Sequence, residues 1–420
     1  MYPLLKNLTF QIVISAIFGI GLAFIYEALI PSGSEVVNNS ISFLKDGFLA
    51  LLKMLIAPMI FFSLLGGIIS LGNVVQLRRL GGITVSYYLF TTGIAITLAL
   101  IAVVFVHPWT AYPPIMGSMI ETANTRLLEP GSDSILEVLS TMTSLAFTNP
   151  FSALANLNIL GIVANAIFIG IAMVFVLDGV SPLFRFVEDV NKIIIQVVQW
   201  VIRVLPVGIF AILFDFTMKL SGDDGLGGTL LIQLFQFGIL VVSITLIHGV
   251  IVLPTIAWIT TKTSPLELLK KTAGPLIVAF STSSSATTLP LSMQTAQEKL
   301  DVAPSVSSFV LPLGATMNMD GTALFEAVAA IFLAYLYGIE LSSIMMVTIF
   351  FMAMVASIGA PGMPSASMSG MQMVMLAIGI PLEAIALLLV VERPLDTIRT
   401  SVNVEGDLVG SLVVDRYLKR

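Results

Sequence analysis

Long apolar segments alternate with short polar ones along most of this chain. A helix needs roughly 20 apolar residues to cross a bilayer. Segments of that kind predict spans at Leu8–Ile30, Ile41–Leu71, Gly82–Val106, Ile159–Leu177, Ile193–Phe214 and Leu230–Trp258. With the C-terminal third included, about eight spans fit, and we predict an all-α polytopic membrane protein.

From Pro265 onward, polar residues interrupt the apolar segments at regular intervals. The interruptions are Ser281–Pro290, Asn318–Thr322, Ala356–Pro364 and Asn403–Asp407. Polar-tipped segments and broken helices thus alternate, which indicates an internal inverted repeat. Paired, interrupted segments point to a transporter's binding site, because non-helical backbone in a membrane must be buried in protein or line a wet cavity. We predict two re-entrant helical hairpins that meet in mid-membrane.

Composition supports a membrane protein and excludes several other classes. The chain has 420 residues, of which 57% are hydrophobic and 10% are charged, whereas soluble domains carry about 25% charged residues. The absence of cysteine excludes disulfides and thiolate metal sites, and sparse basic residues argue against nucleic-acid binding. Leu8–Ile30 has no Ala-x-Ala exit, so it is expected to be a first span and not a signal peptide.

Basic residues gather at alternate ends of successive predicted spans. By the positive-inside rule, this placement puts both termini in the cytoplasm. The residues are Lys6, Arg78, Arg79, Arg185, Lys192, Lys262, Lys270, Lys271, Arg416, Lys419 and Arg420.

The last apolar segment, Val391–Val414, contains five polar side chains on one helical stripe. From Asp396, the others follow three, four, seven and eleven residues later: Arg399, Thr400, Asn403 and Asp407. Charges inside a membrane are costly, so such a stripe normally lines a polar pathway. The Arg399 fork matches a carboxylate, and Asp396 can accept an ammonium group. An internal Arg399–Asp396 ion pair is the alternative.

Asn318 and Asp320 lie at a predicted backbone break beside Gly321. Freed carbonyls and carboxylate oxygens suit a hard cation, although Asp320 as a helix cap is the alternative. Glu326 is either a proton carrier or a hydrogen-bonded structural acid. His107 and His248 are expected to be structural, Glu392 is expected to pair locally with Arg393, and Glu405 has no role that we can argue.

These motifs resemble the dicarboxylate/amino acid:cation symporter family, which includes archaeal aspartate transporters and human excitatory amino acid transporters. The resemblance covers the whole chain. Its early markers are Leu51–Pro58, Tyr87–Thr92, Asn149–Phe151 and Arg203–Pro206. Its more specific markers are the Ser-rich tip, Asn318–Thr322, Ala356–Pro364 and the pattern Asp396-x-x-Arg399-Thr400-x-x-Asn403-x-x-x-Asp407.

The resemblance implies a homotrimer in which a transport domain moves like an elevator against a static scaffold domain. Scaffold helices would lie in residues 1–75 and 141–220. The transport domain would comprise helix 3 with an extracellular loop in 76–140, helix 6 in 221–264, and a core in 265–420. That core would contain hairpin 1, helix 7, hairpin 2 and helix 8.

The resemblance also implies binding residues. The substrate would be bound by Ser284, Ser285, Ala286, Thr322, Met363, Asp396, Arg399, Thr400 and Asn403. One sodium ion would be bound by Gly314, Asn318, Asn403 and Asp407. A second would be bound by carbonyls of Thr316, Ser357, Ile358 and Ala360. A third would be bound by Tyr88, Thr91, Thr92, Asn318 and Asp320.

Within that family, Arg399 together with Asp396 favours aspartate or glutamate as substrate. The chain also departs from the family pattern. Ser283 and Thr397 stand where archaeal and vertebrate members, respectively, carry an arginine, and Ser367 replaces a glycine near the second hairpin tip. Glu326 matches a glutamate of vertebrate members that is implicated in proton and potassium coupling.

We therefore predict a sodium-coupled symporter that imports L-aspartate or L-glutamate by an elevator mechanism, with several Na⁺ per substrate. Its expected place is the cytoplasmic (inner) membrane of a prokaryote. A proton-coupled or mixed symporter, with H⁺ and K⁺ as further ions, is the alternative. Other classes are an ion channel and an intramembrane aspartyl protease using Asp320 and Asp407, although we expect no enzyme.

Overall fold

The computed structural model describes residues 8–30, 34–72, 78–112, 114, 143–144, 146–178, 181–220, 226–359, 367–381 and 384–419. Every regular element in these ranges is a helix, which confirms the predicted all-α class. Several helices begin and end within a few residues of the predicted spans.

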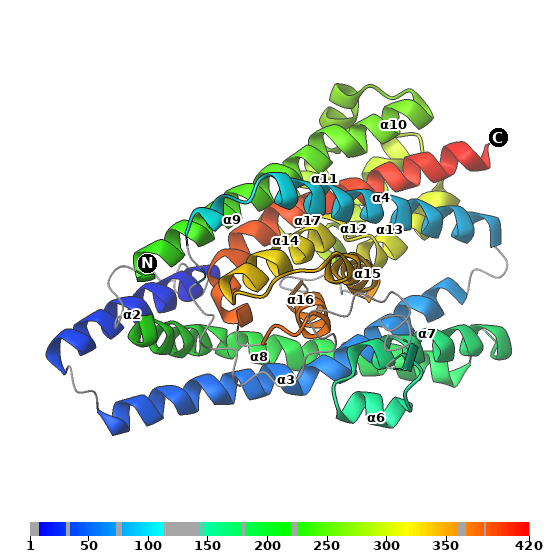
Figure 1. The fold of residues 1–420 in the computed structure, drawn as a ribbon. Helices are drawn as coiled ribbons and strands as arrows, with labels where there is room; N and C mark the ends of the chain where they lie inside the picture. Colours follow the sequence, from blue (N-terminus) through cyan, green and yellow to red (C-terminus); the bar gives the residue numbers. More distant parts are fainter. Residues whose placement is uncertain are drawn as a thin grey trace.

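One group of helices forms the lower layer in Figure 1. α3 packs against α7 and α8, and α2 packs against α8. Its helices are α2 (Leu8–Leu29), α3 (Glu35–Gly72), α6 (Pro150–Ala155), α7 (Ile159–Val176) and α8 (Pro182–Leu220).

The remaining helices form the upper layer, which surrounds α17. They are α4 (Arg78–Phe105), η2 (Pro108–Ala111), α9 (Leu226–Ile247), the π-helical η4 (His248–Val252), α10 (Leu253–Thr261), α11 (Pro265–Thr282), α12 (Ser285–Glu298), α13 (Pro304–Met317), α14 (Asp320–Leu336), α15 (Ser343–Gly359), α16 (Ser367–Ala377) and α17 (Ile385–Leu418). α17 is in contact with α9, α10, α11, α12, α13 and α14, so its polar stripe lies inside this layer.

Two of the predicted interruptions coincide with helix ends. Ser283 adopts a left-handed φ of 51° at the end of α11, and Ser284 caps the start of α12, so the Ser-rich segment makes a turn. The predicted break at Asn318–Thr322 is confirmed, because α13 ends at Met317 and α14 starts at Asp320. Much of the interruption at Ala356–Pro364 lies outside the described residues.

The predicted break at Asn403–Asp407 is wrong, because α17 is one helix across that segment. Its side chains supply polar partners to the broken helix beside it. Residues four positions apart project from one face of a regular helix, so Asn403 and Asp407 can both face the α13–α14 break while α17 stays helical.

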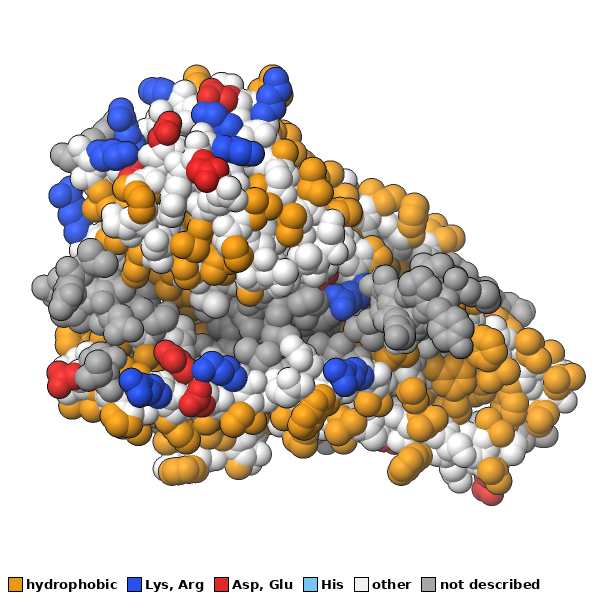
Figure 2. Space-filling view, turned by 180° about the vertical axis from the view of Figure 1, so that it is seen from behind, with side chains coloured by type: hydrophobic (Ala, Val, Ile, Leu, Met, Phe, Trp, Pro, Cys, Tyr) orange, Lys and Arg blue, Asp and Glu red, His pale blue; other side chains and the backbone are white. Residues whose placement is uncertain are grey.

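Three described helices are long and apolar enough to cross a membrane: Arg79–Ala111, Thr229–Thr261 and Pro304–Leu336. A fourth is obtained if the bent pair Pro182–Val201 and Arg203–Asp215 counts as one span. Four shorter apolar helices accompany them, so the total of about eight spans stays a prediction. Figure 2 shows hydrophobic side chains over much of one face, as a lipid-facing surface requires.

Candidate functional site

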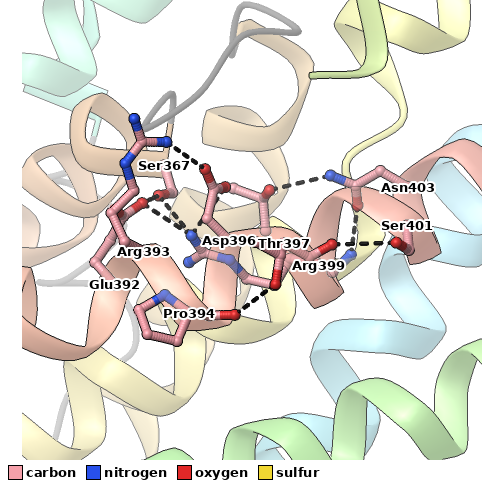
Figure 3. Close-up of polar contacts among 11 residues, drawn as sticks. Ser367, Glu392, Arg393, Pro394, Asp396, Thr397, Arg399, Ser401 and Asn403 are labelled. Atoms are coloured by element: carbon pink, nitrogen blue, oxygen red, sulfur yellow. Dashed lines mark hydrogen bonds and ion pairs between the residues drawn. The ribbon is translucent and has the colours of Figure 1, made fainter. Parts of the chain in front are cut away.

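The side chains of the polar stripe on α17 are buried between the helices of the upper layer. Arg399 has no exposed surface, and Asp396, Asn403 and Asp407 are each at most 5% exposed. Their spacing on one helix brings them onto a common face, as the sequence predicts. Figure 3 shows the part of the stripe around Arg399.

Arg399 donates through a single nitrogen to three oxygen acceptors. Its Nη2 lies 3.0 Å from Oε1 of Glu392, 3.2 Å from Oδ1 of Asp396 and 3.1 Å from Oγ of Ser367. The Ser367 hydroxyl also donates to Oε1 of Glu392, at 3.0 Å. Arg399 therefore forms the ion pair with Asp396 that the sequence left as an alternative, and a second ion pair with Glu392.

The other nitrogens of the guanidinium group remain available for a ligand. Nη1 and Nε of Arg399 have no hydrogen-bond partner among the residues that the structure describes. The guanidinium carbon lies 3.9 Å from the centre of the Phe325 ring, which holds the plane of the group by a cation–π contact. Buried arginine donors normally find acceptors, so Nη1 or Nε is suited to one oxygen of a bound carboxylate, whose other oxygen would pair with Nη2.

Glu392 and Ser367 both contact Arg399, and sequence reasoning predicted neither contact. Glu392 was expected to pair with Arg393, but Arg393 lies 3.7 Å from Asp396 instead. The seven-residue separation of Glu392 and Arg399 is two helical turns, which was a usable signal. Ser367 comes from another helix, so its contact was not readable from the sequence.

A second polar cluster surrounds Asp320 at the start of α14. Its Oδ1 accepts hydrogen bonds from Thr92 at 2.6 Å and Thr91 at 3.3 Å, both on α4. Its Oδ2 lies 3.0 Å from Nε2 of His248, and both side chains are fully buried. His248 was expected to be only structural, so this contact with a candidate cation ligand was missed.

Asn318 connects this cluster to the end of the polar stripe. Its Nδ2 donates to Oδ1 of Asp407 at 2.9 Å, and its Oδ1 lies 3.5 Å from the Thr91 hydroxyl. Gly314 is close to the same carboxylate: a Cβ there would lie 2.3 Å from Oδ1 of Asp407 and 2.5 Å from the Tyr88 hydroxyl. Only glycine leaves that space to the oxygen atoms.

Asn403 lies between the Arg399 cluster and the Asp320 cluster. Its Oδ1 accepts a hydrogen bond from the Gly321 backbone N–H at 2.8 Å, and its Nδ2 donates to Oγ1 of Thr322 at 3.2 Å. One side chain of α17 thus satisfies the first turn of α14, whose N–H groups lack helical partners. The two clusters are consequently neighbours along the α14–α17 contact.

The donor set suits a hard cation better than a transition metal. Hydroxyl, amide and carboxylate oxygens converge here from α4, α13, α14 and α17, and hard cations prefer such ligands. No group of three or more His, Asp or Glu side chains in the described part of the chain is arranged to hold a metal ion.

The remaining residues of the predicted substrate and sodium sites are not all buried at one place. Ser284 and Ser285 are buried at the α11–α12 turn and Thr400 is buried on α17, whereas Ala286 is exposed. The Thr316 side chain is exposed, and the Ser357 hydroxyl donates to the backbone of its own helix. Ile358 is partly buried, and its carbonyl faces Gly67 on α3. The predictions for Ala360 and Met363 fall outside the described residues.

Glu326 lies on α14, which packs against α15 and α16. It is fully buried, and neither carboxylate oxygen has a hydrogen-bond partner among the described residues. A Cβ added at Gly370 of α16 would lie 2.0 Å from its Oε1. The described residues therefore supply none of the hydrogen-bond partners that the structural alternative for Glu326 required.

The chain matches the model of the sodium:dicarboxylate symporter family along residues 8–417. An excitatory amino acid transporter of Caenorhabditis elegans is 32% identical, over 99% of this chain and 88% of that protein. An excitatory amino acid transporter of Onchocerca volvulus is 32% identical, over 99% and 90%. A neutral amino acid transporter B(0) of Oryctolagus cuniculus is 33% identical, over 89% and 72%.

Proposed function

Because the chain belongs to the sodium:dicarboxylate symporter family, a family of multi-pass membrane transporters, we propose that it is a sodium-coupled importer of acidic amino acids. Family membership makes it a transporter with an amino acid substrate, and it removes the hypothesis of an intramembrane aspartyl protease.

The proposal of an acidic substrate rests on the unpartnered hydrogen-bond donors of Arg399. Its Nη1 and Nε are buried without partners beside Asp396, in the arrangement that a side-chain carboxylate and an ammonium group would fill. A neutral amino acid would leave those donors unsatisfied, which costs about 1 to 3 kcal/mol for each buried group. Relatives include both excitatory and neutral amino acid transporters, so this side chain is the feature that favours the acidic class.

Sodium coupling is proposed from the oxygen cluster around Asp320 and Asp407. Na⁺ would be held by oxygens of Tyr88, Thr91, Thr92, Gly314, Asn318, Asp320, Asn403 and Asp407, and a further ion by Thr316, Ser357, Ile358 and Ala360. The bound cations would offset the repulsion between these acids and an incoming dicarboxylate. Substrate and sodium then strengthen each other's binding by the same coupling free energy.

Asn403 offers a physical route for this coupling. It bonds to Gly321 and Thr322 at the start of α14, where Asp320 begins the helix, and it lies on the same stripe as Arg399. An ion that fixes the α13–α14 break would also fix Asn403, and hence the substrate side of α17.

The larger assembly is proposed on the family's behaviour. The chain would form a homotrimer in the cytoplasmic membrane, with both termini inside. Helices in 1–75 and 141–220 would be the static scaffold, and helices in 76–140, 221–264 and 265–420 would move as the transport domain.

Proton participation is a second candidate, which the environment of Glu326 favours. A buried carboxylate without hydrogen-bond partners is most easily accommodated in its neutral, protonated form. Release of that proton on the other side of the membrane would couple a proton to the cycle.

Uptake of radiolabelled aspartate and glutamate into proteoliposomes tests these proposals, with sodium, proton and potassium gradients imposed in turn. Uphill accumulation that requires an inward sodium gradient is expected, whereas an ion channel gives no uphill accumulation. Equal uptake without sodium rejects sodium coupling. Glu326→Gln should abolish any component that is driven by the proton gradient and leave the sodium-driven component.

A further inference from the structure

Ser367 of α16 forms hydrogen bonds with two charged side chains of α17. It is the first residue of α16, it is 1% exposed, and its hydroxyl joins Arg399 to Glu392. Figure 3 shows the three side chains facing one another, with Ser367 on α16 and the other two on α17. The contact therefore fixes the start of α16 to the polar stripe.

Arg399 Nη2 has more hydrogen-bond acceptors around it than it has hydrogens to donate. This nitrogen carries two hydrogens, but three acceptors lie within 3.2 Å of it: Glu392, Asp396 and Ser367. The Glu392 carboxylate and the Ser367 hydroxyl occupy positions where an incoming carboxylate would form the second bond of a bidentate pair. They therefore compete with a substrate's side-chain carboxylate for the guanidinium group.

A second contact from the same face of α16 holds the helix in this position. Gly370 is three residues after Ser367, so both face the same neighbours. The Glu326 carboxylate lies against Gly370, where a Cβ would come within 2.0 Å of Oε1. α16 thus packs against Glu326 of α14 and Arg399 of α17, and these two contacts set the position of Ser367 beside Arg399.

We propose that Ser367 is a specificity-determining residue, which weakens the binding of acidic amino acids by competing for Arg399. This inference rests on the proposed function. Neutral amino acids have no side-chain carboxylate for Arg399, so their binding does not depend on displacing Ser367. The hydroxyl therefore narrows the difference in affinity between an acidic amino acid and its neutral counterpart.

Ser367→Ala tests the inference with aspartate and asparagine, which have nearly the same shape and differ by one charge. The KM for aspartate uptake is expected to fall by about five- to tenfold, the effect of removing one competing hydrogen bond to a charged group. The inhibition constant of asparagine against aspartate uptake is expected to change less than about twofold, since no such competition exists. If asparagine inhibits aspartate uptake by neither the wild type nor Ser367→Ala, its binding is taken as unchanged by the substitution.

Two further variants and a control make the result specific. Ser367→Gly also removes the hydroxyl and should match Ser367→Ala, whereas Ser367→Thr keeps it and should match the wild type. Thr348→Val on α15 removes a buried hydroxyl that donates to the Ile344 carbonyl of its own helix and to no other described residue, and it should leave both constants unchanged.

An unchanged or raised KM for aspartate in Ser367→Ala and Ser367→Gly overturns the inference. So does a parallel fall of both constants, because Ser367 would then affect binding of every substrate alike. If the wild type neither binds nor transports aspartate, the proposed function itself fails. Normal aspartate uptake with an unchanged KM in the variants rejects only the role of Ser367.

Discussion

Arg399 is a single positive charge held between two acids inside the protein, so removing it has two effects. Arg399→Gln should abolish uptake of acidic amino acids, because the planar fork that matches a carboxylate is lost. It should also destabilise the protein by about 3 to 5 kcal/mol, since Glu392 loses its buried ion pair with Arg399 and Asp396 loses one of its two arginine partners. Uptake in proteoliposomes, together with a thermal unfolding curve of the purified protein, measures both effects.

Arg203 provides the matched control for that variant, because its side chain is exposed on α8. Arg203→Gln should leave both acidic uptake and stability close to those of the wild type. Retained high-affinity uptake of aspartate in Arg399→Gln would contradict the assignment of Arg399 to the substrate carboxylate.

His248 is expected to act through Asp320. Its imidazole holds Oδ2 of that carboxylate at 3.0 Å, while Thr91 and Thr92 hold Oδ1. Partners that orient a ligand in this way typically change cation affinity by about 10- to 100-fold. His248→Ala should therefore raise the sodium concentration for half-maximal aspartate binding by about tenfold.

His107→Ala is the control for this second variant, since His107 is exposed at the end of α4 and should leave the sodium dependence unchanged. The measurement is aspartate binding to purified protein in a sodium titration. A His248→Ala protein with normal sodium dependence would show that the imidazole only fills space.

At the level of elements, the seating of α16 on α14 depends on the absence of a side chain at Gly370. Gly370→Ala would bring a methyl group against the Glu326 carboxylate and the Ala356 side chain. Overpacking of this kind costs about 1 to 3 kcal/mol, and here it would push α16 away from Arg399. Both the unfolding temperature and the rate of uptake should fall.

Gly238→Ala on α9 should have neither effect, because no described residue beyond its chain neighbours and its own helix backbone lies within 4 Å of the added methyl group. In a helix interior, alanine is the better helix former by about 1 kcal/mol, so a small stabilisation is the expected result. If Gly370→Ala behaved in the same way, the contact between α16 and Glu326 would be of no consequence.

The same elements show what sequence reasoning was able to predict. The break between α13 and α14 was predictable, because Asn318, Asp320 and Gly321 interrupt an apolar run. The continuity of α17 was not, since Asn403–Asp407 has a similar composition but remains helical. Composition marks where polar groups gather, but it does not say whether their backbone or their side chains provide the contacts.

For the candidate site, the sequence indicated the stripe on one helix but not the partners from other helices. Asp396, Arg399, Asn403 and Asp407 lie on a common face by period alone. The contacts of His248 with Asp320 and of Ser367 with Arg399 join residues 72 and 32 positions apart. Such pairs depend on how helices pack, which a single sequence does not specify.

For the whole molecule, an elevator mechanism requires the upper layer of helices to move against the lower one. One of the contacts between the two layers is that of α15 with α3, where a Cβ added at Gly67 would lie 3.7 Å from the Ile358 carbonyl oxygen. The chain has no native cysteine, so introduced pairs are the only thiols. Gly67→Cys together with Ile358→Cys would place two thiols at this contact, and cross-linking them through a disulfide should stop uptake.

A second pair distinguishes movement between the layers from damage by cross-linking. Gly66 on α3 lies against Asn191 on α8, both in the lower layer, and a Cβ there would be 2.8 Å from the Asn191 amide nitrogen. Oxidising Gly66→Cys with Asn191→Cys should leave uptake intact, because these helices would not separate during the cycle. Each single-cysteine variant should remain active, and reduction should restore the cross-linked transporter. Continued uptake after complete cross-linking of residues 67 and 358 would mean that this contact persists throughout transport, which an elevator does not allow.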